Sequence, residues 1–176
     1  MAIVPKIITL AKSSSSASVI KVLRYYASLK NFETCFDKKC CAALELLCLL
    51  TTVSKRSAES RRCIIDIQED CADMRSYIRK LPASRLTPFL LKISECYTIV
   101  VDKEALTQSS NSCMEAIVLL LSVYYVFHIG WCKATILTLL FMQTEMLKLS
   151  LDDEDIHYGS VSIFTNALDA IHEEQE

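Results

Sequence analysis

A stretch of seventeen residues without a formal charge, Ala116–Cys132, constrains the fold of this chain more than any other feature. A second apolar run, Ala134–Met142, follows after one lysine. A helix that is apolar on every side is buried either in a protein core or in a bilayer. A spanning helix needs about 20 mostly apolar residues, and the first run is shorter and contains Ser122 and His128. We therefore expect two core helices, with a membrane hairpin or single span at 116–142 as the alternative.

Glycine and proline are scarce, with two glycines and three prolines in 176 residues. Tight β-hairpins depend on Gly, Asn-Gly and Asp-Gly turns, and neither dipeptide occurs here. The composition therefore predicts an all-α fold, either a compact bundle or a short solenoid of about seven helices, with a buried apolar central pair. We expect residues 1–15 to form a flexible, basic, serine-rich segment and residues 16–174 to form a single helical domain.

Apolar periodicity and capping signals place the expected helices along the chain. Ser112 and Glu115 have the spacing of a capping box and predict the start of the apolar helix, which Gly130 is expected to end. Thr87 followed by Pro88 predicts the start of another helix. The expected helices begin near residues 19, 40, 62, 88, 112, 131 and 161.

The segment 62–81 has the clearest amphipathic pattern. Its apolar positions are spaced three and four residues apart, at Ile64, Ile67, Cys71, Met74, Ile78 and Leu81. The opposite face would carry Arg62, Asp66, Glu69, Asp73 and Arg79. This spacing predicts a helix docked on the core by its apolar seam, or a helix that inserts into or lines a partner's groove. We take the five charged residues as candidate partner-binding residues.

Two short segments resemble known helical families. SRRCIIDIQEDCADMRSYI, at 60–78, resembles the third helix of an armadillo repeat, which implies an armadillo- or HEAT-like solenoid. Gly130-Trp131-Cys132-Lys133 resembles part of the Asn-Trp-Gly-Arg motif of the Bcl-2-like bundle, which implies an apolar central hairpin and a groove formed by an amphipathic helix. Both resemblances imply an all-helical fold.

Charge is distributed unevenly, although the net charge is only −2. Residues 1–32 contain five basic residues and no acid, whereas residues 152–176 contain eight acids and no lysine or arginine. One interpretation is that both ends are solvated or attract each other across the fold. The other is that they form a basic contact surface and an acidic partner-binding segment. The near-neutral balance predicts no binding to nucleic acid.

Catalytic and metal-binding patterns are absent from the sequence. The two glycines, Gly130 and Gly159, cannot supply a P-loop or a dinucleotide fingerprint, and the three histidines lie in no local catalytic signature. The nine cysteines are odd in number and form no paired zinc knuckles. We therefore expect free thiols in a reducing cytoplasmic or nuclear compartment, no metal, no cofactor and no enzyme activity.

These features together predict a non-enzymatic helical protein–protein interaction module, an adaptor or regulator whose partner is another protein. One alternative is a membrane-associated helical protein with a hairpin or span at 116–142, which would include a Bcl-2-like regulator. An armadillo- or HEAT-like solenoid fragment is the other. A ligand-binding apolar pocket between helices remains a further possibility that no motif supports.

Overall fold

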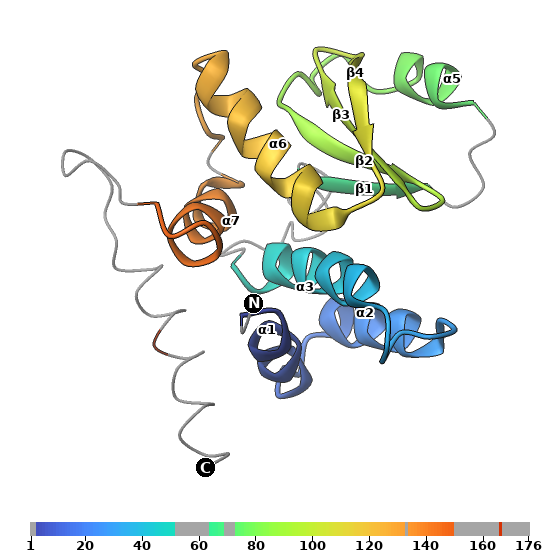
Figure 1. The fold of residues 1–176 in the computed structure, drawn as a ribbon, viewed down its shortest axis with the longest axis vertical. Helices are drawn as coiled ribbons and strands as arrows, with labels where there is room; N and C mark the ends of the chain where they lie inside the picture. Colours follow the sequence, from blue (N-terminus) through green and yellow to red (C-terminus); the bar gives the residue numbers. More distant parts are fainter. Residues whose placement is uncertain (1–2, 52–63, 69–72, 133, 150–165, 167–176) are drawn as a thin grey trace.

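The computed structural model describes residues 3–51, 64–68, 73–132, 134–149 and 166, and it shows a mixed α/β fold (Figure 1). The predictions of an all-α bundle and of an armadillo- or Bcl-2-like helical fold are therefore wrong. The elements in chain order are α1 Ile3–Lys12, α2 Ala17–Ser28, α3 Phe36–Leu50, β1 Ile65–Gln68, α5 Met74–Arg79, β2 Phe89–Ile93, β3 Cys96–Val101, β4 Glu104–Ser110, α6 Cys113–Val126, α7 Ile136–Phe141 and the π-helix η1 Met142–Met146.

Within the described residues, four strands form one sheet in the order β1-β2-β3-β4. β1 pairs in parallel with β2, with Ile65 opposite Leu90, and the connection between them contains α5. β2, β3 and β4 form an antiparallel meander, in which Leu90 pairs with Ile99 and Val101 pairs with Glu104. The register between β3 and β4 shifts between Thr98 and Val100, as at a β-bulge.

Two tight turns in this meander use residues other than glycine. Asp102 and Lys103 join β3 to β4 with φ angles of 47° and 64°, which is the pair of positive φ angles that a type I′ hairpin turn requires. Ser94, with φ of 53°, opens the two-residue connection from β2 to β3. The scarcity of glycine therefore did not exclude hairpins. The predictions of helices beginning near residues 62 and 88 are wrong, because these segments form β1, β2 and β3.

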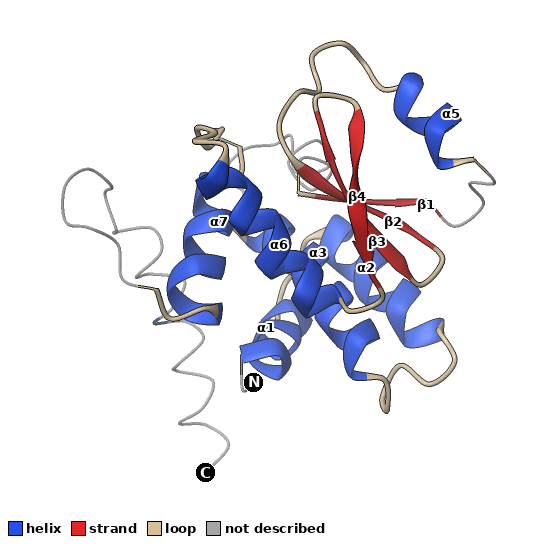
Figure 2. Cartoon of the chain, turned by 45° about the horizontal axis from the view of Figure 1, so that its top comes forward, coloured by secondary structure: helices blue, strands red, loops and turns tan. Residues whose placement is uncertain are grey.

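Helices cover both faces of the sheet (Figure 2). On one face, Leu90 and Ile99 pack in the main core with residues of α3 and α6. On the other face, Phe89, Leu91 and Val100 form a smaller core with α5. β2 is therefore buried on both sides, which explains its uninterrupted apolar start, because strands covered on both faces show no alternation of polar and apolar residues.

A second helical layer lies behind α3. α1 and α2 both pack against α3 (Figure 1), and α1 contributes Val4, Ile7 and Ala11 to the main core. Residues 3–12, which lie within the segment expected to be flexible, form this helix. α3 confirms the predicted buried helix, since every residue from Cys40 to Cys48 is buried.

The apolar run at 116–132 forms a shorter helix than predicted. α6 begins as expected at the capping box, where the Ser112 hydroxyl accepts a hydrogen bond from the Glu115 amide at 3.4 Å. It ends at Val126, before Gly130, and leaves Val126 and Phe127 70% and 59% exposed. Within the described ranges, no helix has both the length and the apolar character needed to cross a bilayer. The helix predicted near residue 161 lies outside the described residues, apart from Asn166.

Candidate functional site

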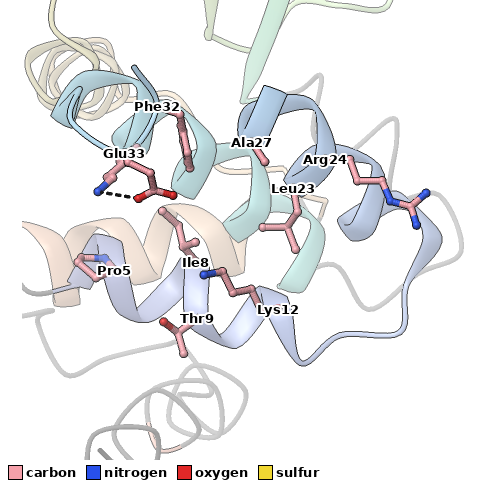
Figure 3. Close-up of a pocket in the computed structure, with 10 residues that line it drawn as sticks. Pro5, Ile8, Thr9, Lys12, Leu23, Arg24, Ala27, Phe32 and Glu33 are labelled. Carbon is pink, nitrogen blue, oxygen red and sulfur yellow. Dashed lines mark ion pairs between the residues drawn. The ribbon is translucent and has the colours of Figure 1, made fainter. Parts of the chain in front are cut away.

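A groove between α1 and α2 is a concave surface of the described residues around which a binding site can be built (Figure 3). It encloses about 460 Å³. Its apolar lining comes from Pro5, Ile8, Leu23, Ala27 and Phe32. Its polar lining comes from Thr9, Lys12, Arg24, Glu33 and Lys39. Most of these residues belong to α1 or α2, and Phe32, Glu33 and Lys39 extend the groove toward the start of α3.

Helical spacing explains why this groove exists. In α1, Val4, Ile7 and Ala11 are buried in the main core, whereas Ile8 lies one position beyond Ile7 and remains half-buried. The same offset separates Val22, which is buried in α2, from the half-buried Leu23. Because each helix has a second apolar stripe beside its core-facing one, the two stripes face each other across the groove.

Basic side chains surround the apolar centre of the groove. Lys12 and Arg24 are exposed at its edge, and Figure 3 shows Arg24 extending away from Leu23 toward the outside. Lys39 forms an ion pair with Glu33, with Nζ 3.4 Å from Oε2. Since residues 1–32 contain no acid, Glu33 supplies the negative charge among the lining residues, and the surface presented by α1 and α2 is basic.

A buried polar network lies on the inner side of α2. The Tyr26 hydroxyl donates to Glu45 Oε1 at 2.6 Å and lies 3.2 Å from Cys41 Sγ. Burial, with the neighbouring Cys41 and Glu45, raises the pKa of Tyr26 far above its ordinary value. The hydrogen bond with Cys113 is the largest of the interactions that lower the pKa of the Cys41 thiol, and hydrogen bonds with Tyr26 and Tyr97 lower it further. Burial alone would raise this pKa. The network connects α2, α3, β3 and α6, and its position inside the core indicates a structural role.

Asp37 joins the same elements at the edge of this network. Its Oδ1 accepts from the Cys113 amide at 2.5 Å, and its Oδ2 accepts from the Tyr97 hydroxyl at 2.9 Å. Cys113 is the first residue of α6, where backbone amides have no intrahelical acceptor. The carboxylate at the start of α3 therefore caps α6 and also binds β3.

A second polar cluster surrounds Asp66, one of the predicted partner-binding residues. Asp66 Oδ2 accepts from Tyr77 Oη and from Arg85 Nη1, each at 2.6 Å, and Oδ1 accepts from Gln68 Nε2 at 2.9 Å. Burial opposes the charge of Asp66, but these hydrogen bonds hold the pKa of its carboxyl below the ordinary value. The Arg85 guanidinium also lies 3.7 Å from the centre of the Phe89 ring. Asp66 is 4% exposed. Its hydrogen bonds with Tyr77 and Arg85 connect β1 to α5 and to the segment after it.

The predicted set of five charged residues does not form one helix face. Asp66 lies on β1, whereas Asp73 caps α5 by accepting from the Arg75 amide at 3.0 Å. Arg79 lies in the last turn of α5 and is exposed. Arg62 and Glu69 lie outside the described residues. A partner-binding role for Asp73 and Arg79 stays a prediction, but the continuous helix on which it was based is wrong.

The α1–α2 groove was missed in the sequence because residues 1–15 were predicted to be flexible. The signal that could have found it was the spacing of Val4, Ile7 and Ala11, which is helical and apolar. The basic character of this region was noticed, but no surface could be assigned to it. In the part of the chain that the structure describes, no group of three His, Cys, Asp or Glu side chains could hold a metal ion.

Comparisons of this chain with protein-family models, with curated proteins and with solved structures find no match. The roles assigned to its residues therefore come from their geometry and chemistry.

Proposed function

We propose that this chain is a non-enzymatic protein–protein interaction module, and that the α1–α2 groove binds an acidic amphipathic helix of a partner protein. The single observation that carries the proposal is an apolar groove of about 460 Å³ with Lys12 and Arg24 exposed at its edge. An amphipathic helix binds such a groove by placing its apolar side chains inside and its charged side chains at the rim.

Charge selects the kind of helix that fits. Five basic residues and no acid in residues 1–32 would repel a basic helix and attract an acidic one. The attraction acts between solvent-exposed groups, so salt should weaken it, because the Debye length is only about 8 Å at physiological ionic strength. The apolar contacts should persist at high salt.

The cysteines support a reducing compartment for this function. Seven cysteines lie in the described residues, and all seven are free thiols. Disulfides are rare in the cytosol and nucleus, so we propose a cytoplasmic or nuclear location.

Fluorescence anisotropy of the full chain with two synthetic peptides tests the proposal. One is a 20-residue amphipathic helix with leucines on one face and glutamates on the other, and the second has lysines in place of the glutamates. We expect the acidic peptide to bind at least tenfold more tightly. Equal affinity for both peptides, or no binding of either, would contradict the proposal.

A matched pair of double variants locates the binding surface. Lys12→Glu/Arg24→Glu reverses the charge at the edge of the groove. Arg75→Glu/Arg79→Glu reverses the charge at two exposed positions on α5, across the sheet from α3. We expect the groove variant to lose at least tenfold in affinity for the acidic peptide and the α5 variant to lose less than twofold. The reverse result would move the partner surface to α5 and refute the groove assignment.

A further inference from the structure

We propose that the acidic segment 151–176 of this same chain binds in the α1–α2 groove and competes there with the partner helix. This inference rests on the proposed function, because it names a particular occupant for the same groove. The occupant is chosen by charge, by the spacing of its apolar residues and by its reach.

Charge complementarity is the first argument. Residues 152–176 contain eight acids and no lysine or arginine, and residues 1–32 contain five basic residues and no acid. No other pair of segments of similar length in the chain separates the two signs so completely. Opposite charges at the two ends therefore favour contact between them over contact of either end with itself.

The apolar pattern of the segment is the second argument. Val161, Phe164, Leu168 and Ile171 are spaced three, four and three residues apart, so a helix would place all four on one face. A helical stretch of eleven residues is about 16 Å long, and α1 with its ten residues is about 15 Å long. The apolar face of such a helix would therefore be about as long as α1, which lines one side of the groove.

Reach is the third argument. The residues before the segment, in η1 and at Leu147, pack against the same core cluster as Val4 and Ile7 of α1. Figures 1 and 2 both place α7 and α1 on the same side of the molecule. The eleven residues 150–160 can span about 36 Å when extended, which is more than twice the length of α1.

A second exposed apolar surface, on α6, could also bind segment 151–176, but it lacks basic side chains. The end of α6 exposes Tyr125, Val126 and Phe127, and Val118 is exposed nearer its start, but these four residues include no lysine or arginine. This surface could cover an apolar face, but it would leave the eight acids of segment 151–176 without a basic counterpart. The α1–α2 groove offers both an apolar surface and basic side chains.

Binding within one chain has a regulatory consequence. A tethered segment acts at an effective concentration of about 1 mM for a short flexible linker. A partner helix in solution must therefore displace segment 151–176 before it occupies the groove. Its apparent affinity for the full chain is lower than its affinity for a chain whose segment is released.

Carbodiimide cross-linking of the full chain, read by mass spectrometry, tests the inference. The reagent condenses a lysine amine with a carboxylate to an amide, with loss of water to the carbodiimide, and so joins only groups in contact. We expect Lys12 to couple to Asp169 or Glu173 at least fivefold more than the exposed Lys80 or the half-buried Lys103 couples to them. A mixture of ¹⁴N and ¹⁵N protein distinguishes links within one chain from links between chains.

The variant Phe164→Asp/Leu168→Asp keeps every acid of the segment and removes its apolar face. We expect it to lose the Lys12 links and to bind the acidic test peptide about tenfold more tightly than the wild-type chain. Links to Lys80 or Lys103 at the same yield, or links only between different chains, would overturn the inference.

Peptide binding distinguishes failure of this inference from failure of the proposed function. If the acidic peptide binds the wild-type chain and the variant with equal affinity, the groove is a binding site but segment 151–176 does not occupy it. If neither chain binds the peptide, the groove is not a helix-binding site and both proposals fall.

Discussion

Replacing Asp66 by asparagine should destabilise the protein strongly, because it removes a negative charge from a buried cluster. The carboxylate and the Arg85 guanidinium are 2.6 Å apart, with side chains 5% and 13% exposed. Breaking a buried ion pair by removing one partner typically costs about 3–5 kcal/mol. Arg85 retains some exposure, so we expect the lower end, about 3 kcal/mol, which corresponds to a fall in Tm of about 6–12 °C for a domain of this size.

Urea denaturation of wild type and Asp66→Asn at pH 7 measures this loss, and a pH series checks its cause. The pKa of Asp66 is lower in the folded protein than its ordinary value. Its contribution to stability is therefore complete above the unfolded pKa of about 3.9 and is lost as the pH falls through the folded pKa. The difference between the two proteins should stay constant from pH 5 to pH 8 and shrink below about pH 4.

An exposed ion pair provides the control. Lys148 Nζ lies 2.9 Å from Glu145 Oε2, but the Lys148 side chain is 73% exposed. Glu145→Gln should therefore cost less than about 1 kcal/mol, as surface pairs do. A loss below about 1 kcal/mol for Asp66→Asn, or a loss that does not change down to pH 3, would refute the assignment of stability to the buried charge.

Four further substitutions test the fold. Tyr26→Phe removes a hydroxyl from the buried network and should cost about 1–3 kcal/mol in thermal unfolding; a change near zero would show that the network adds no net stability. Lys103→Gly, in the turn with Asp102, should raise stability by about 0.5–1 kcal/mol, because a positive φ of 64° strains a lysine but not a glycine; destabilisation in urea would contradict the type I′ turn. Ile7→Ala should cost about 2–5 kcal/mol, and Ile8→Ala clearly less, because only Ile7 is fully buried; equal losses in urea unfolding would contradict the packing of α1.

The sequence identified the elements with strong local signals. The buried helix α3 and the cap of α6 at Ser112 were both predicted correctly, because apolar continuity and a capping box act within a few residues. The sheet was missed for a non-local reason. Ile64 and Ile67 have the spacing of a helix seam, yet residues 65–68 pair with β2 more than twenty residues later, and single-segment periodicity does not report such pairing.

The groove was missed because residues 1–15 were expected to form a flexible, basic, serine-rich segment. Pro5 lies inside the helix that they form instead, as the third residue of α1. The first four amides of a helix have no intrahelical acceptor, so a proline there loses no hydrogen bond. The charge asymmetry between residues 1–32 and 152–176 was visible in the sequence, whereas the surface that makes use of it became apparent only when α1 was placed beside α2.

The bond from the Cys113 amide to Asp37 spans 76 positions of the chain. Helix ends ordinarily fray, and their first amides exchange with solvent without unfolding the rest of the molecule. Here the acceptor of that amide belongs to α3, so we expect deuterium to enter at Cys113 only after the hydrogen bond to Asp37 breaks. The exchange rate of this amide therefore gives a single-residue readout of the contact between α3 and α6.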